Sequence, residues 1–227
     1  MILSPSQRQK LDSSDDQLFY DYPRFVTHVD DGFIDQLTQL YGTLLQPNDR
    51  VLDLMSSWVS HLPDFAFREV VGHGMNAAEL AKNRRLDRYF VQNLNTDPKL
   101  PLADQSFEAV LVAVSVQYLQ YPEAVFAEIQ RVLTPGGICI VSFSNRMFYQ
   151  KAIAAWRDST DTDHLQLVQH YFQQTPGFDK PTVVTQRSDQ PLLLQMLGLG
   201  HRDPFYAVYA RRQSLGGGVE ESQQLLT

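Results

Sequence analysis

Short, continuous runs of apolar residues recur along the chain, and such runs are typical of strands covered on both faces of a sheet. The predicted strands span residues 51–55, 70–72, 89–91, 109–115 and 138–143. Apolar residues at three- and four-residue spacing predict helices at 33–45, 77–83 and 123–133. This alternation of strands and helices predicts a parallel sheet with helices on both of its faces.

The pattern changes after about residue 175. Residues 182–187 and 205–211 read as two strands, with a possible short helix at 192–197 between them. An antiparallel pair that closes one edge of the sheet is the simplest account of this region. We therefore predict an α/β fold, a doubly wound, Rossmann-like and mostly parallel seven-stranded sheet with an antiparallel C-terminal strand pair.

Both ends of the chain are polar and poor in apolar anchors. We expect residues 1–17 to be a flexible N-terminal tail and residues 213–227 to be a flexible C-terminal tail. No linker rich in Pro, Gly or Ser divides the residues between them. We expect residues 18–212 to form a single domain, which suits a chain of 227 residues.

The composition and net charge of the chain exclude several classes of function. Hydrophobic residues make up 43% of the chain, and the formal net charge is −7, which argues against binding nucleic acid or an anionic membrane. No run approaches the roughly 20 apolar residues of a membrane span, and residues 1–17 contain no apolar run of a signal peptide. We expect a soluble, cytoplasmic protein with no membrane span. The sequence leaves its oligomeric state open.

In an open parallel sheet, ligands bind beyond the carboxyl ends of the strands. The residues that follow the predicted strands are polar and carry little charge, which suits a neutral or zwitterionic ligand better than a polyphosphate. These candidates are Asp53, Ser56, Ser57, Trp58, His61, His73, Gly74, Met75, Asn76, Asn93, Leu94, Asn95, Ser115, Gln117, Tyr118 and Arg146. The chain lacks the glycine-rich phosphate loops of nucleoside triphosphate and nicotinamide sites and the G-x-S-x-G turn of hydrolases.

Two stretches carry a family resemblance: LPLADQSFEAV at residues 100–110 and EIQRVLTPGG at residues 128–137. In order, spacing and strand–helix context they resemble the class I S-adenosylmethionine-dependent methyltransferases over about residues 48–145. The chain is most similar to the type 11 branch, in a subgroup with SSWVSH after the first strand. The resemblance implies S-adenosylmethionine as the cofactor and methyl transfer to a small molecule.

The chain departs from the family pattern in its cofactor loop. Asp53 stands at the acid of the first motif, but the glycine positions that follow it read Met55, Ser57 and Val59. Gly74 stands where the family carries the acid that binds the ribose hydroxyls. We therefore expect a loop of another shape, and cofactor binding weaker than the family norm by about one to two decades, because a charge-assisted hydrogen bond is lost.

The resemblance also implies roles for individual residues. Tyr118 and His28 are the candidate catalytic residues, since a base is needed if the methyl acceptor is a hydroxyl. The candidate cofactor-binding residues are Asp53, Ser56, Ser57, His73, Gly74, Met75, Asn76, Asn93, Leu94, Asn95 and Ser115. The candidate substrate-binding residues are Tyr22, Arg24, Gln117, Arg146, Trp156 and Tyr171.

Two further readings concern metals and catalysis. His164 and His170 are six residues apart and would face different sides of a helix, so we expect no metal site.

The altered loop and the missing ribose acid leave an alternative open. In that alternative the chain is a catalytically inactive, methyltransferase-like protein that acts as a binding or regulatory partner.

Overall fold

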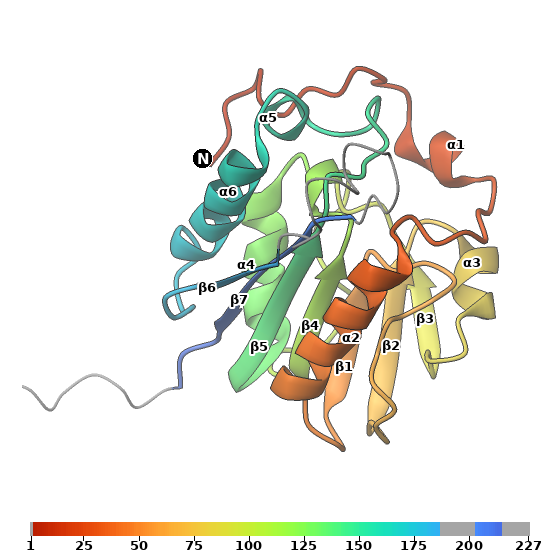
Figure 1. Ribbon diagram of the computed structural model, residues 1–227, viewed down its shortest axis with the longest axis vertical. Coiled ribbons are helices and arrows are strands. Elements are labelled where there is room, and N and C mark those ends of the chain that lie inside the picture. The colour runs from red at the N-terminus through yellow and green to blue at the C-terminus, as the bar shows by residue number, and fades with distance from the viewer. Residues whose placement is uncertain (1, 187–202, 215–227) are drawn as a thin grey trace, which may run out of the picture.

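The computed structural model describes residues 2–186 and 203–214 (Figure 1). Its centre is a seven-stranded sheet in the order β3-β2-β1-β4-β5-β7-β6, in which β5–β7 and β7–β6 pair antiparallel and the other pairs are parallel. The strands are β1 (Arg50–Leu54), β2 (Glu69–Gly74), β3 (Arg88–Val91), β4 (Phe107–Ala113), β5 (Leu133–Phe143), β6 (Thr182–Gln186) and β7 (Phe205–Arg211). The predicted fold class, including the antiparallel C-terminal pair, is confirmed.

Helices cover both faces of this sheet. The longer ones are α2 (Asp31–Leu44), α4 (Pro122–Val132) and α6 (Asp161–Gln173), and the shorter ones are α1 (Asp16–Tyr20), α3 (Ala77–Lys82), α5 (Ala154–Arg157) and the 3₁₀ turn η1 (Val116–Tyr118). In Figure 1, α2 lies in front of the central strands and α4 lies behind β5. None of the helices within the described ranges is both long and apolar enough to cross a bilayer.

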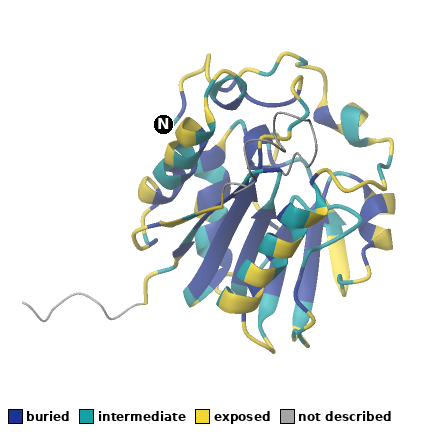
Figure 2. Cartoon of the chain, viewed as in Figure 1, coloured by how far each residue is buried: buried dark blue, intermediate teal, exposed yellow. Residues whose placement is uncertain are grey.

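The core divides into two layers, because successive side chains of a strand point to opposite faces. Leu52 and Val110 pack on the face that α4 and α6 cover, while Val51 and Leu111 pack on the face that α2 covers. The central strands are accordingly buried along almost their whole length (Figure 2). A sheet buried on both faces explains why its strands read as unbroken apolar runs.

The strand β3 does not follow this pattern. Tyr89 and Val91 are each 42% exposed, so the expectation that every apolar run is covered on both faces is wrong for this strand. The reason is its place in the sheet. Among the described strands, β3 lies at the edge of the sheet and pairs with β2 alone.

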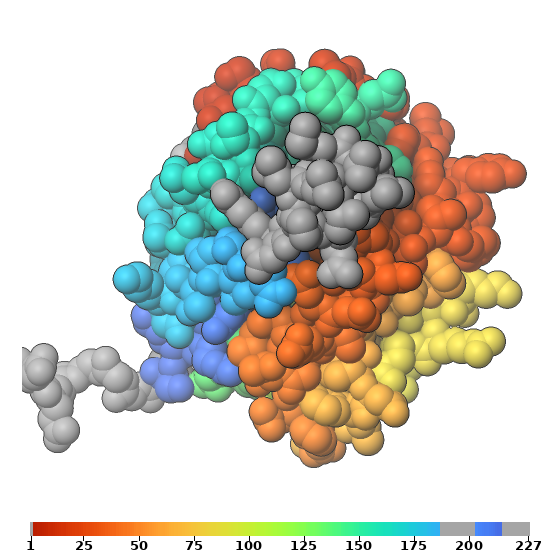
Figure 3. Space-filling view, viewed as in Figure 1, coloured from red at the N-terminus to blue at the C-terminus, as the bar shows by residue number. Residues whose placement is uncertain are grey.

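Residues 2–30, here called the N-terminal segment, cross the molecule above the carboxyl ends of the strands (Figure 1). The space-filling view shows this segment along the upper edge and the right side of the molecule (Figure 3). We expected a flexible tail as far as residue 17, but Leu3 is buried in the core and the Arg8 guanidinium pairs with Glu123 in α4. Ion pairs between residues far apart in the sequence hold this polar stretch, and apolar anchors alone do not reveal them. The predicted helix at 192–197 and almost all of the predicted tail at 213–227 lie outside the described residues.

Candidate active site

A cavity of about 370 Å³ lies at the carboxyl ends of the parallel strands, beneath the N-terminal segment. Its lining includes residues from the ends of β1, β2 and β4, as expected for a doubly wound sheet. The predicted site residues that line it are Arg24, His28, Asp53, Ser56, Ser57, Trp58, His61, His73, Gly74, Met75, Asn76, Asn93, Leu94, Asn95, Ser115, Tyr118 and Arg146. Residues that the sequence reasoning missed also line it, among them Asp16, Tyr20, Ser60, Glu79 and Phe148.

The backbone is strained at two positions beside the cavity, one in the loop after β1 and one after β4. Met55, which occupies the first glycine position of the family motif, has a φ of 59°, in the left-handed region that glycine adopts at little cost. Val114, after β4, has a φ of 50°, and a β-branched residue is rarely found there. Both strained residues line the cavity, and such strain concentrates at functional sites.

Asp53, at the end of β1, is the buried acid of this loop. Its Oδ2 accepts hydrogen bonds from the hydroxyls of Ser56, at 2.6 Å, and Ser60. Burial raises the pKa of the Asp53 carboxyl, and the two serine hydroxyls partly oppose that rise. The two serine hydroxyls thus satisfy the buried carboxyl from within its own loop.

His73, in β2, joins three strand ends. Its Nδ1 accepts a hydrogen bond from the Met55 amide at 3.1 Å, and its Nε2 lies 2.9 Å from the carbonyl oxygen of Gln92. A carbonyl can only accept, so the proton is on Nε2 and the ring is neutral. Burial lowers the pKa of His73 to about 4. Both ring nitrogens therefore bond to the protein, and through them His73 ties the strained loop to the residue after β3.

Gly74 ends β2 directly under the loop. A Cβ atom at this position would lie 2.6 Å from the carbonyl oxygen of Ser56, and the Ser56 amide donates to the carbonyl of His73 at 2.6 Å. The loop therefore fills the space in which an acidic side chain at position 74 would begin.

This contact gives a testable prediction. Gly74→Ala is expected to destabilise the protein by about 2 kcal/mol, because overpacking against a fixed backbone forces the loop to move. Gly42→Ala is the matched control, since the nearest atom to a Cβ at position 42 in α2 is 3.9 Å away; it is expected to stabilise the helix by up to about 1 kcal/mol. Denaturant unfolding of both variants checks the pair, and equal effects would contradict the packed loop.

The asparagine side chains at the cavity differ in how much hydrogen-bonding capacity they keep for a ligand. Asn76 caps α3 through Oδ1 and donates its amide hydrogens to the carbonyls of Tyr20 and Asp21. Asn95 is equally occupied, because Nδ2 donates to Asp16 and to the carbonyl of Tyr118 while Oδ1 accepts from the Gln120 amide. Asn93 accepts one bond, from the Asn95 amide, and so keeps capacity for a ligand.

Glu79 is the most informative residue that sequence reasoning missed. It lies in the first turn of α3, is buried, and accepts hydrogen bonds from the Ser57 hydroxyl at 2.7 Å and from the Arg24 amide at 2.6 Å. An acidic residue is common in the first turn of a helix, because its negative charge interacts favourably with the positive end of the helix dipole. The sequence analysis therefore did not single out Glu79 as a site residue, although its position shortly after the second predicted strand pointed to the cavity.

The two candidate catalytic residues have different chemical capacities. Tyr118 Oη accepts a hydrogen bond from the Phe148 amide at 2.8 Å, and burial raises the pKa of Tyr118 to about 12. A hydroxyl with this pKa can donate a hydrogen bond but is a poor base at neutral pH. The His28 ring lies edge-on to Phe148, 5.1 Å between centroids, and partial burial lowers its pKa. A neutral imidazole at the cavity is suited to accept a proton.

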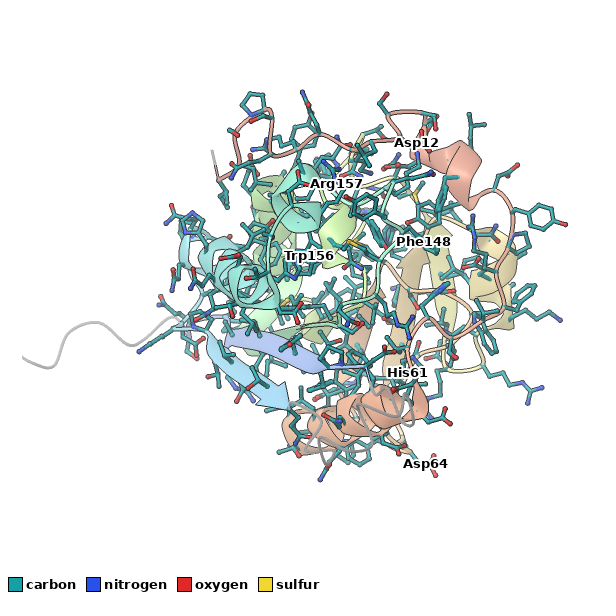
Figure 4. All side chains as sticks on the ribbon, turned by 45° about the horizontal axis from the view of Figure 1, so that its top comes forward. Asp12, His61, Asp64, Phe148, Trp156 and Arg157 are labelled. Atoms are coloured by element: carbon teal, nitrogen blue, oxygen red, sulfur yellow. The ribbon has the colours of Figure 1, made fainter. Side chains whose placement is uncertain are left out.

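Four of the predicted substrate contacts do not line the cavity. Tyr22 is 81% exposed on the N-terminal segment, and the buried Gln117 amide donates to the carbonyl of Val114. Trp156 stacks on His164 of α6, 4.0 Å between ring centroids, and lies beside that helix in Figure 4. Tyr171 is in the core against Phe126. Local sequence pattern does not separate aromatic core residues of this kind from ligand contacts.

Charged side chains at the cavity are partly neutralised. Arg146 pairs with Asp203 at 2.7 Å, and Asp16 pairs with Lys10 at 2.5 Å and with Lys151 at 3.3 Å. Among residues 2–186 and 203–214, neither Asp53 nor Glu79 forms an ion pair with a cation. In the same ranges, no three His, Cys, Asp or Glu residues cluster as metal ligands would.

Comparisons with known proteins agree with this geometry. Residues 56–141 match the family model described as a methyltransferase domain. A protein of known structure from Pyrococcus horikoshii is 17% identical, with a TM-score of 0.58 over 87% of this chain and 99% of that chain. An S-adenosylmethionine-dependent methyltransferase from Mesorhizobium loti is 17% identical, with a TM-score of 0.51 over 77% and 96% of the two chains.

The [4+2]-cyclase SpnF also shares the fold, at 17% identity and a TM-score of 0.53 over 79% of this chain and 82% of that chain. A search of curated protein sequences finds no match. The family model covers the segment that carries both sequence motifs, and the similar structures share the sheet and its helices. The resemblance is thus confirmed: residues 56–141 match a methyltransferase domain, and the chain shares the fold of S-adenosylmethionine-dependent methyltransferases of known structure.

Proposed function

We propose that this protein transfers a methyl group from S-adenosylmethionine to a small molecule, and that it does so in the cytoplasm. The observation that carries the proposal is the cavity at the strand ends, into which Asp53 and Glu79 bring carboxyl groups with no cationic partner among the described residues. Uncompensated acidic groups at a partly buried site favour a cationic ligand. A sulfonium cofactor is such a ligand.

The residues present fit a nucleoside cofactor of this kind. The Ser57 hydroxyl and the Glu79 carboxylate meet at the cavity wall, and Asn93 keeps acceptor capacity after the end of β3. Asp53, Ser57, Glu79 and Asn93 are therefore the residues that would hold it. When bound, S-adenosylmethionine supplies a methyl group activated by the sulfonium.

The chain's own residues would position and deprotonate the acceptor. His28, neutral at pH 7 because its pKa is lowered, would take a proton from an acceptor hydroxyl at a ring nitrogen. Tyr118 would orient the acceptor by donating its hydroxyl hydrogen, since Oη already accepts from Phe148. The N-terminal segment would exclude water from above, and positioning of the two reactants would supply most of the acceleration.

Isothermal titration of the purified protein with S-adenosylmethionine and with S-adenosylhomocysteine tests the proposal. Micromolar binding of either ligand is the expected result. A similar fold is found in the [4+2]-cyclase SpnF, so the fold alone does not fix the reaction. No heat and no thermal shift at millimolar ligand would contradict the proposal and support the alternative, a binding protein without catalysis.

Asp53→Ala gives a second check on the same site. Removing this carboxyl is expected to weaken cofactor binding at least about ten-fold, because a buried charged hydrogen-bond partner of the loop is lost. Asp104→Ala is the control, since Asp104 is an exposed acid that pairs with Arg131 and does not line the cavity. Equal affinity of wild type and Asp53→Ala would remove Asp53 from the site.

A further inference from the structure

The end of β2 holds few groups that can accept a hydrogen bond from a ligand. Gly74 has no side chain and no space for one. His73 Nδ1 already accepts from the Met55 amide, and Asn76 Oδ1 accepts from the amides of Ala78 and Glu79. A ligand with hydroxyl donors at this end of the strand therefore needs an acceptor from another element.

Glu79 offers such an acceptor. Its side chain lines the cavity from α3, the helix that directly follows β2, and it is only 8% exposed. Each of its carboxylate oxygens accepts one hydrogen bond, from Ser57 and from the Arg24 amide. A carboxylate has about four acceptor positions, so the residue keeps capacity for two more bonds while being held in place by the two it makes.

We propose that Glu79 binds the ribose hydroxyls of the nucleoside cofactor, a proposal that rests on the function proposed above. In doubly wound nucleotide-binding folds, an acid near the end of the second strand commonly accepts bonds from a ribose hydroxyl. Here the acid comes from the first turn of the following helix. Among the described residues, two other acids line the cavity: Asp53 lies in β1 and is bonded to Ser56 and Ser60, and Asp16 is paired with Lys10 and Lys151.

The two departures from the family motif are linked through this residue. Ser57 stands at a glycine position of the first motif, and its hydroxyl donates to Glu79 at 2.7 Å. The loop that carries Ser57 is also the loop whose backbone closes off position 74. The absence of an acid at position 74 and the serine at position 57 are therefore parts of one rearranged ribose pocket.

The test compares ligands that differ only in the ribose. Affinities of S-adenosylhomocysteine and of its 2′-deoxy and 3′-deoxy analogues are measured for wild type, Glu79→Gln and the control Glu69→Gln. Glu69 begins β2 at the opposite end and pairs with Arg50 and Arg88, away from the cavity. Wild type and control are expected to bind at least one deoxy analogue about ten-fold more weakly than the parent ligand, since a charge-assisted bond is lost.

Glu79→Gln is expected to bind the parent ligand at least about ten-fold more weakly and to distinguish the analogues by no more than about two-fold. A merely structural role would lower all three affinities together and leave the discrimination intact, which would overturn the proposal. Wild type that binds the parent ligand and both analogues equally well would also overturn it. Wild type that binds none of them would instead contradict the proposed function.

Should Glu79→Gln fail to fold, Glu79→Asp takes its place. This variant keeps the negative charge but withdraws the carboxylate by one methylene group. Its discrimination between parent and deoxy ligands is expected to fall below that of wild type. Discrimination equal to that of wild type would count against the assignment.

Discussion

Acidification from pH 7 to pH 4 is expected to cost the folded protein up to about 3 kcal/mol through His73 alone. The pKa of His73 is lowered from its ordinary 6.5 to about 4, chiefly by burial. The unfolded chain gains a proton on this histidine near pH 6.5, whereas the folded chain resists protonation until about pH 4. The stability contributed by a neutral His73 is therefore complete above pH 6.5 and is lost as the pH falls from 6.5 towards 4.

The measurement is the free energy of unfolding at several pH values for wild type and for His73→Gln. Glutamine offers one acceptor and one donor, as the neutral ring does, but cannot be protonated in this range. His28, His61 and His164 also have lowered pKa values and contribute equally to both proteins. The wild type should lose more stability than the variant, and parallel pH profiles would contradict the role assigned to His73.

Lys151→Met is expected to destabilise the protein by about 3 kcal/mol and to release the N-terminal segment. The Lys151 side chain is completely buried, and its Nζ lies 3.0 Å from Asp12 and 3.3 Å from Asp16. Asp12 lies on the N-terminal segment just before α1 (Figure 4). Removing one member of a buried ion pair leaves its partner without compensation, although Lys10 still pairs with Asp16.

Denaturant unfolding and limited proteolysis of the N-terminal segment check this prediction. Lys82→Met is the matched control, because Lys82 is exposed at the end of α3, and its replacement should change stability by less than about 0.5 kcal/mol. Early cleavage before residue 20 is expected in Lys151→Met alone. Wild-type stability and cleavage in that variant would show that the buried lysine does not hold the segment.

The apolar runs predicted the sheet because strands covered by helices on both faces have little choice of residue type. The strand positions were also right at the antiparallel edge, where the residues expected as strands from 182 and from 205 form β6 and β7, although β6 is mostly exposed. It did not hold for the exposure of β3, because a run of apolar residues does not reveal that a strand has a single neighbour. The packing of the N-terminal segment could not be predicted from the sequence either, because partners such as Arg8 and Glu123 are 115 residues apart.

The candidate site shows a similar division. Strand ends could be located from the sequence, so most residues expected to meet there do line one cavity. The hydrogen-bonding capacity that each side chain keeps for a ligand could not be derived from the sequence, because it depends on hydrogen bonds between different helices, strands and loops. His73, Asn76 and Asn95 are occupied by the protein itself, whereas Glu79 keeps acceptor capacity. Trp156 and Tyr171 resembled substrate contacts in sequence, yet they pack in the core.

The rearranged loop after β1 and the end of β2 are proposed to hold the cofactor together. Amide hydrogen exchange of the wild-type protein, with and without saturating S-adenosylhomocysteine, tests it most directly, because exchange reports protection segment by segment. Slower exchange in residues 53–62 and 73–80 is the predicted result. Binding that leaves both segments unchanged, or that protects only segments remote from the cavity, would contradict the account.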